Sequence, residues 1–306
     1  MKPGELDLVQ ALLEQHRLPV PASLEELRAG VEQLTSSFPA PEGMCFEAVP
    51  IAGERLPALQ ALWGRPRARK ARGVLLYLHG GGFMVGSAHG FRGLAGTLAE
   101  QAASEVLIVD FRRAPEHPFP AAVEDVAAAY RWLLEQGTPA SGIVLAGDSA
   151  GAGLVLSALL AARAASLPMP AGALLMSPWV DLSLSGASLG AKQHEDTILA
   201  PAQLEHLARA YLGETPATHP LASPLMADLA GLPPLCIQVG SAELLLDDAV
   251  RLAGKAGASG VDVRLEIWPG MPHVWHGFAP MLRPGRQAIA RGAAFLRERL
   301  DGSAPE

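Results

Sequence analysis

A serine stands between two glycines in the segment GDSAG, residues 147–151. The apolar run at residues 143–146 precedes it and a helical pattern begins at Ala150, so Ser149 falls at a strand-to-helix turn. A turn this tight needs small residues around the serine and presents its hydroxyl above the sheet, which is the geometry of a nucleophile elbow. The alternative is a glycine-rich turn whose serine only caps a helix.

A second chemical signal, HGGG at residues 79–82, ends another apolar run about 70 residues before the serine. Acyl transfer creates a negatively charged oxygen, and backbone N–H groups approach such an oxygen closely where side chains are absent. We assign these donors as the amides of Gly81, Gly82 and Ala150, and we expect His79 to position the loop. A phosphate cradle is the alternative, but the glycines fit neither GxGxxG nor GK[ST].

These two motifs, in this order and spacing, resemble those of the hormone-sensitive lipase family of α/β-hydrolases, which includes bacterial esterases. Residues 110–126 (DFRRAPEHPFPAAVEDV) and 177–182 (SPWVDL) are also similar to family segments. The resemblance spans roughly residues 70–300 and implies an α/β-hydrolase fold and ester hydrolysis by a serine, an acid and a histidine. Ala152 departs from the pattern, since many members carry a second glycine there.

The acid must follow the serine and precede the histidine in this fold. The resemblance, aligned on Leu-Pro-Pro at residues 232–234, places Glu243 where the family usually has the catalytic aspartate. Glutamate is one methylene longer, so it needs a retracted backbone or a bent rotamer to reach the imidazole. Asp247 and Asp248 remain alternative acids, although both also suit the first turn of the helix predicted to follow.

His273 is the predicted base, because it follows the last predicted strand and stands thirty residues after Glu243, the spacing that the resemblance implies. His276 is its competitor. In the predicted mechanism Ser149 attacks an ester carbonyl, His273 accepts the proton and Glu243 orients the imidazole, giving an acyl-enzyme. The sequence has no HExxH or other spaced metal pair, and we expect no metal and no cofactor.

Apolar strand-like runs alternate with helical patterns between residues 73 and 300. This rhythm predicts an α/β fold with a doubly wound, mostly parallel, eight-stranded sheet covered on both faces. It breaks at residues 181–231, a stretch of about 50 residues with one good helix at 201–212, too long for a plain loop. We expect residues 1–42 and 181–231 to form a helical cap over a catalytic domain of residues 43–180 and 232–306.

Composition and charge limit which partners and which cell compartment we expect. The chain has 306 residues, 49% of them hydrophobic, and a net charge of −7 with no basic run beyond residues 65–72, so nucleic acid is not an expected partner. No apolar run reaches the ~20 residues of a membrane helix, and the N-terminus does not resemble a secretory signal. We therefore expect a cytoplasmic protein without membrane insertion. Cys45 and Cys236 both have apolar neighbours and are predicted to be buried.

The last predicted strand, residues 263–268, would leave an unpaired sheet edge, and we expect a homodimer through it. The resemblance implies small-molecule esters with short to medium acyl chains, bound between the cap and the strand ends. Phe83, Trp179, Trp275 and Phe278 are candidates to line this pocket, or ordinary core residues. A lactone or carbamate hydrolase, a peptidase and a non-catalytic small-molecule binder are the alternative functions.

Overall fold

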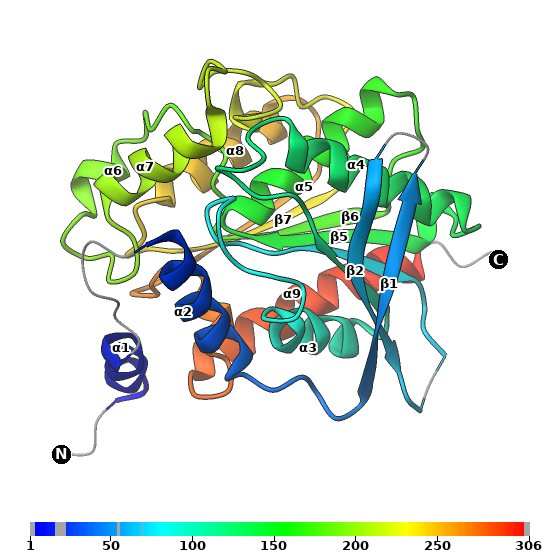
Figure 1. The fold of residues 1–306 in the computed structure, drawn as a ribbon, viewed down its shortest axis with the longest axis horizontal. Coiled ribbons are helices and arrows are strands. Elements are labelled where there is room, and N and C mark those ends of the chain that lie inside the picture. Colours follow the sequence, from blue (N-terminus) through cyan, green and yellow to red (C-terminus); the bar gives the residue numbers. More distant parts are fainter. Residues whose placement is uncertain (1–3, 16–22, 54–55, 69, 303–306) are drawn as a thin grey trace.

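The computed structural model describes residues 4–15, 23–53, 56–68 and 70–302. The strands of this part form one eight-stranded sheet in the order β1-β2-β4-β3-β5-β6-β7-β8 (Figure 1). β2 pairs antiparallel with β1 and β4, and all the other neighbours are parallel. The strands are β1 (Met44–Gly53), β2 (Leu56–Pro66), β3 (Val74–Leu78), β4 (Glu105–Asp110), β5 (Ile143–Asp148), β6 (Gly172–Met176), β7 (Leu235–Gly240) and β8 (Val263–Trp268). The predicted α/β fold is confirmed.

Helices cover both faces of the sheet, with α3 and α9 on one face and α4, α5 and α8 on the other (Figure 1). Two further pairs, α1 with α2 and α6 with α7, lie toward the same end of the molecule in that view. The α-helices are α1 (Glu5–Gln15), α2 (Leu24–Ser36), α3 (Arg92–Ala102), α4 (Ala121–Glu135), α5 (Ala150–Ala164), α6 (Ser188–Ala191), α7 (Pro201–Leu212), α8 (Leu246–Ala258) and α9 (Arg283–Asp301). Short 3₁₀ helices lie at Ala140–Gly142, Pro224–Met226 and Trp275–Phe278.

The central strands are apolar throughout because both of their faces are buried. All five residues of β3 are buried. Leu76 and Leu78 pack into the core under α4, α5 and α8, whereas Leu75 and Tyr77 pack into the core under α3 and α9. Successive side chains of a strand point to opposite faces, so a sheet between two helical layers needs apolar residues at every position.

The two edges of the sheet are less buried. The strand order confirms that β8 is an edge strand, and its Ile267 is 47% exposed. On the opposite edge, β1 directs Met44 into the core and Cys45 outward. The prediction that Cys45 is buried is therefore wrong, because an apolar neighbourhood in sequence does not fix which face of an edge strand a residue occupies. Cys236, in β7, is buried as predicted.

Helix α2 is fastened to the loops that follow β3 and β4. Arg28 forms a two-pronged ion pair with Glu116, with both N–O distances 2.7 Å, and its Nε donates to the carbonyl of Met84 at 2.9 Å. Glu32, one turn along the helix, accepts a hydrogen bond from the Ser87 hydroxyl at 2.6 Å. Such charge-assisted bonds fix orientation as well as adding stability. Helix α2 is thereby held against the HGGG loop.

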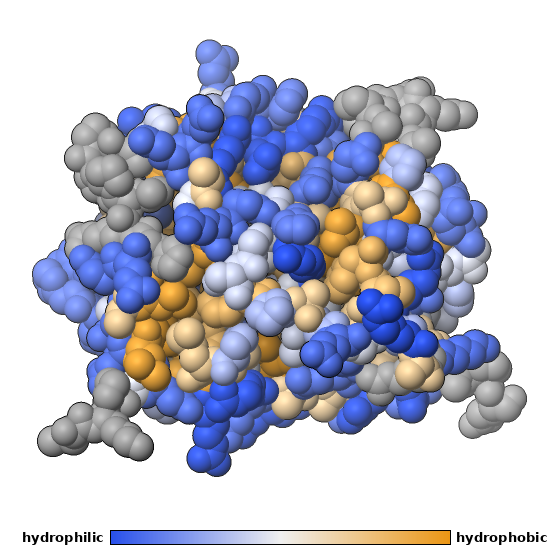
Figure 2. Space-filling view, turned by 60° about the horizontal axis from the view of Figure 1, so that its bottom comes forward, coloured by the Kyte–Doolittle hydropathy of each residue, from blue (hydrophilic) through white to orange (hydrophobic). Residues whose placement is uncertain are grey.

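On the face drawn in Figure 2, hydrophilic side chains cover most of the area and apolar side chains gather in patches between them. Among the residues that the structure describes, no helix combines the length and the apolar character needed to cross a membrane.

Candidate active site

Ser149 occupies a sharp turn between β5 and α5, with φ 53° and ψ −123°. The two flanking glycines of the motif have no room for a side chain. A Cβ on Gly147 would come within 2.6 Å of the Gly151 carbonyl, and a Cβ on Gly151 within 2.1 Å of the Leu78 carbonyl oxygen. A strained serine conformation of this kind persists where the surrounding backbone enforces it. The turn presents Ser149 at the wall of a cavity.

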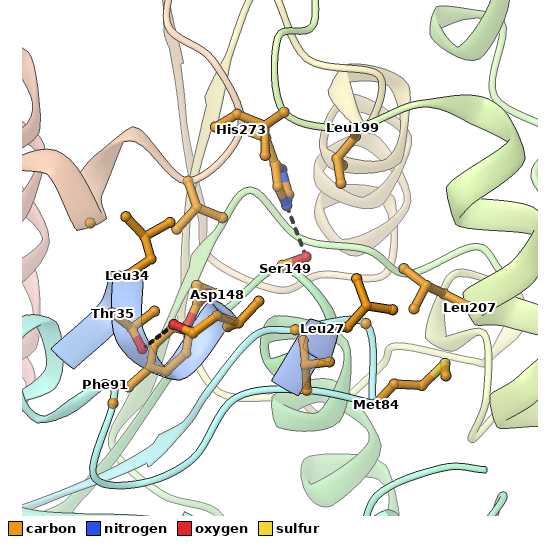
Figure 3. Close-up of a pocket in the computed structure, with 18 of the residues that line it drawn as sticks. Leu27, Leu34, Thr35, Met84, Phe91, Asp148, Ser149, Leu199, Leu207 and His273 are labelled. Atoms are coloured by element: carbon orange, nitrogen blue, oxygen red, sulfur yellow. Dashed lines mark hydrogen bonds between the residues drawn. The ribbon is translucent and has the colours of Figure 1, made fainter. Parts of the chain in front are cut away.

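His273 and Glu243 continue a row of hydrogen bonds that begins at this serine. The Nε2 atom of His273 lies 2.9 Å from Ser149 Oγ, and its Nδ1 lies 2.8 Å from Glu243 Oε2. The dashed line between His273 and Ser149 in Figure 3 marks the first of these hydrogen bonds. Because an ionised carboxylate only accepts, Nδ1 donates to Glu243 and Nε2 accepts from the serine hydroxyl. The loops after β5, β7 and β8 thus bring together three residues that are distant in the sequence.

Burial and charge set the proton affinity of this row, whose three members are all buried. Burial lowers the pKa of His273, but the hydrogen bond and the charge of Glu243 outweigh it and raise that pKa above its usual value. Burial also raises the pKa of Glu243, opposed by hydrogen bonds from His273, Gly240 and Ser177. A proton leaving Ser149 can therefore rest on His273, beside a carboxylate that stabilises the imidazolium.

The two alternative acids have other partners. The Asp247 carboxylate accepts a hydrogen bond from the Ser188 amide at 3.0 Å. Asp248 Oδ2 accepts from the amides of Val180 and Asp181 at 2.8 and 2.9 Å. Both residues stand in the first turn of α8, where negative charge favours a helix. Of the three candidate acids, the structure brings only Glu243 to the histidine.

His276 is also separated from the serine. Its Nε2 lies 3.0 Å from Gln238 Oε1, and its ring packs on Trp275 with the centroids 4.0 Å apart. Complete burial lowers the pKa of His276 to about 3, so the ring stays neutral at physiological pH. This histidine belongs to the packing beneath β7 and β8.

The two glycines assigned as oxyanion donors lie in the turn after β3 and line the same cavity as Ser149. Gly81 has φ 108° and Gly82 has φ 59°, and a Cβ on Gly81 would come within 2.3 Å of the Val85 carbonyl oxygen. These positions therefore require glycine. Ala150 is the first residue of α5, so its N–H has no partner within the helix. The three residues assigned as donors thus come from two loops, the turn after β3 and the turn between β5 and α5.

Asp148 and His79 hold the HGGG loop against the serine turn. Asp148 Oδ1 accepts hydrogen bonds from the Tyr77 hydroxyl at 2.7 Å and the Gly80 amide at 3.0 Å. His79 is buried, stacks on Phe111 with the ring centroids 4.4 Å apart, and has Nδ1 2.8 Å from the Gly80 carbonyl oxygen. Burial raises the pKa of Asp148 to about 6 and lowers the pKa of His79. His79 thus contacts the loop rather than the serine hydroxyl.

A cavity of about 690 Å³ opens over Ser149. In the view of Figure 3 its walls lie on both sides of the serine, with Leu34 and Phe91 on one side and Leu207 on the other, and Leu27 lies below it. The lining comes from α1, α2, α7 and the loops after the strands, and it is mostly apolar. Such a wall favours an uncharged organic substrate.

Of the four aromatic candidates for the pocket, Trp179 and Phe278 line the cavity. Phe83 lies behind the wall, stacked on Tyr211 with the centroids 3.8 Å apart, and Trp275 lies in the core. Within the described part of the chain, no three His, Cys, Asp or Glu side chains are grouped so that they could hold a metal ion.

Sequence reasoning missed two residues that support the row. Ser177, just after β6, donates its hydroxyl to Glu243 Oε1 at 2.7 Å and accepts from the Val274 amide at 3.1 Å. A polar residue at the carboxyl end of a buried strand, next to the nucleophile's strand, is the signal that could have identified it. Asp196 hydrogen-bonds the amide of Leu244, next to Glu243, and lies in a segment without periodic pattern.

The sequence of the chain is similar to those of known enzymes. Residues 75–277 match the family described as "alpha/beta hydrolase fold". An acetyl-hydrolase of Streptomyces hygroscopicus is 51% identical over 237 residues, which cover 78% of this chain and 79% of the relative. An esterase of Acinetobacter venetianus is 35% identical over 270 residues, which cover 88% and 87%.

Solved structures agree over almost the whole chain. An esterase from the bacterial hormone-sensitive lipase family superposes with a TM-score of 0.93 at 42% identity, covering 98% of this chain and 99% of that one. EstE5, in a crystal soaked by p-nitrophenyl butyrate, gives a TM-score of 0.91 at 42% identity over 98% and 100%. The chain belongs to the α/β-hydrolases and, within them, to the hormone-sensitive lipase family of esterases. The family resemblance of the sequence is thereby confirmed.

Proposed function

We propose that this carboxylic ester hydrolase works through Ser149, His273 and Glu243. The observation that carries the proposal is the continuous row of hydrogen bonds from Glu243 through His273 to Ser149 Oγ. His273 takes the serine proton as Oγ attacks the ester carbonyl, and the amides of Gly81 and Gly82, with that of Ala150, bind the resulting oxyanion. His273 then protonates the departing alcohol, and a water molecule that it activates releases the acid from the acyl-enzyme.

The proposed substrates are uncharged carboxylic esters with a short to medium acyl chain. The mostly apolar wall of the 690 Å³ cavity supports an uncharged substrate. The name of the acetyl-hydrolase relative supports a small acyl group, and EstE5 was soaked by a butyrate ester. We propose that residues 1–42 and 181–231 act as the cap, since α1, α2 and α7 all contribute to this wall.

Steady-state hydrolysis of p-nitrophenyl esters from acetate to decanoate tests the proposal, run on the wild type and on Ser149→Ala. We expect activity that peaks at short or medium chains and is lost in the folded variant. A fluorophosphonate probe followed by mass spectrometry should label Ser149 in the wild type and nothing in the variant. Full activity of Ser149→Ala would disprove the mechanism, and a wild type that cleaves lactones but not linear esters would replace the substrate class.

We further propose a homodimer through β8. This strand ends the sheet and carries Ile267, which is 47% exposed. A second copy of the chain could pair with the backbone of this edge and bury the Ile267 side chain. Light scattering should give twice the chain mass, and Ile267→Lys should give the monomer. A wild type that scatters as a monomer at micromolar concentration would refute this.

A cytoplasmic location completes the proposal. Cys45 and Cys236 are both free thiols, as is usual in a reducing compartment. Cell fractionation of the host, with an antibody to the protein, is the direct test.

A further inference from the structure

Asp196 lies between α6 and α7 and joins two segments with a single carboxylate. Its Oδ1 accepts hydrogen bonds from the amides of Ile198 and Leu199, both at 2.9 Å. Its Oδ2 accepts from the amide of Leu244, also at 2.9 Å and 48 residues away in the sequence. Three backbone donors on one carboxylate form a strong, orienting set of charge-assisted bonds.

One of the two joined segments carries the proposed acid, and the other lines the cavity. Leu244 directly follows Glu243, so the bond to Leu244 holds the backbone that carries the acid. Ile198 and Leu199 line the cavity that also contains His273, and Figure 3 draws Leu199 and His273 among the lining residues. The same carboxylate therefore fixes a stretch of the substrate wall and the loop of the proposed acid.

A second link binds the loop after β7 to helix α6. The Ser188 hydroxyl donates to the carbonyl of Leu244 at 2.6 Å and accepts from the Asp247 amide at 3.0 Å. The loop after β7 is thus bound through both the N–H and the C=O of Leu244 to residues 188–196. The negative charge of Asp196 also acts on the site directly, since it helps to raise the pKa of His273.

We propose that Asp196 is a positioning residue that couples the pocket wall to the loop carrying Glu243. Removing its charge or its acceptor geometry frees the wall from the acid loop, so substrate binding and the Glu243–His273 alignment both loosen. This inference rests on the proposed roles of Glu243 and His273. It assigns a functional role to a residue that touches neither the ester nor the serine.

Asp196→Asn is the central variant. The asparagine oxygen can still accept from Ile198 and Leu199, but its NH₂ group faces the Leu244 amide, donor against donor, and the charge is lost. We expect kcat for p-nitrophenyl butyrate to fall about tenfold, with a smaller rise in KM. The acid limb of kcat/KM should move to lower pH, because a negative charge that favours protonated His273 is removed.

The neighbouring carboxylate provides the matched control. Glu195 is exposed and forms a surface ion pair with Lys192. Glu195→Gln removes the same charge one residue away without touching the wall or the acid loop. We expect its kcat and pH profile to stay within about twofold of the wild type, as is usual for exposed pairs.

A histidine NMR titration makes the test independent of turnover. In Asp196→Asn the pKa of His273, assigned with His273→Gln, should fall by about half a pH unit. Asp196→Glu retains the charge but displaces the carboxylate, so it should lower kcat while leaving that pKa high. It also serves as the variant to measure if Asp196→Asn does not fold.

Each outcome decides the inference. An unchanged kcat in folded Asp196→Asn would overturn it, whether or not the His273 pKa falls, as would losses that only track the fraction of folded protein by circular dichroism. Equal losses in Glu195→Gln would do the same, since they would indicate a general charge effect. If the activity of the wild type survives Ser149→Ala, the proposed function fails, whereas a loss of kcat in Asp196→Glu at an unchanged His273 pKa tests the positioning role separately.

Discussion

Glu243→Gln is the sharpest test of the acid, because the structure determines how the amide must orient. Glu243 receives three donors, with the Gly240 amide at 2.6 Å and the Ser177 hydroxyl at 2.7 Å on Oε1, and His273 Nδ1 at 2.8 Å on Oε2. A glutamine has one oxygen, and two of the donors converge on Oε1. The oxygen therefore stays there, and the NH₂ group faces His273.

The His273 imidazole must then adopt its other tautomer, because the NH₂ group of the glutamine donates to Nδ1. Nδ1 then accepts from the amide and Nε2 carries the hydrogen, so Nε2 has no lone pair for the proton of Ser149 Oγ, 2.9 Å away. The base is present but cannot act. Loss of the acid's function in such rows lowers kcat by about 10³ to 10⁴. We expect a fall of this size for p-nitrophenyl butyrate, with KM changed by less than about threefold.

Asp247→Asn is the control on the alternative acid. The asparagine oxygen can still accept from the Ser188 amide, so activity should stay within about threefold of the wild type. Thermal unfolding of both variants distinguishes a loss of activity from a loss of folded protein. Near-full activity of Glu243→Gln together with an inactive Asp247→Asn would refute the assignment and transfer the role of the acid to Asp247.

Three further predictions concern pH and chain length. Burial raises the pKa of Asp248 to about 7, so its bound proton stabilises the fold at low pH, and between pH 5 and pH 8 about 2–3 kcal/mol of that stability should be lost. Urea unfolding of Asp248→Asn should lack this component, and an identical pH dependence would count against the raised pKa. Because the pKa of His273 is raised, kcat/KM should decline on the acid side with a midpoint above the usual ~6.5; a midpoint below 6 would contradict this. A Cβ on Gly82 would lie 2.6 Å from Leu207, so Leu207 covers the oxyanion loop, and Leu207→Ala should raise the octanoate-to-butyrate ratio of kcat/KM about tenfold; an unchanged ratio would show that this side chain does not limit the acyl chain.

The sequence predicts most of the sheet because local and long-range signals agree there. Buried parallel strands must be apolar at every position, so runs such as Val74–Leu78 are visible without any knowledge of their neighbours. The predicted helix at residues 201–212 has the same bounds in the structure, beginning at a proline and ending before Gly213. The glycine motifs at residues 79–82 and 147–151 can also be recognised in the sequence, since the need for positions without a side chain arises within each turn.

What the sequence could not reveal depends on side-chain contacts between distant segments. Cys45 is exposed because of the face that it takes on an edge strand, which its apolar neighbours do not determine. Ser177 and Asp196 act through hydrogen bonds to residues 66 and 48 positions away. Ser177 opens the family-like segment at residues 177–182, but neither this segment nor the aperiodic stretch around Asp196 shows which residue each side chain contacts.

Glu243, the proposed acid, shows how the fold accommodates an extra methylene. Its carboxylate folds back over the end of β7, where Oε1 lies 2.6 Å from the amide of Gly240, three residues earlier. A Cβ on Gly240 would lie 3.1 Å from that oxygen and 2.0 Å from the Met271 carbonyl oxygen, so a side chain there would crowd both the acid and the histidine loop. The longer side chain thus reaches His273 by folding back over the end of β7, where Gly240 carries no side chain. The Gly240 amide and the absence of a side chain at this position together allow a glutamate to take the place that an aspartate usually has.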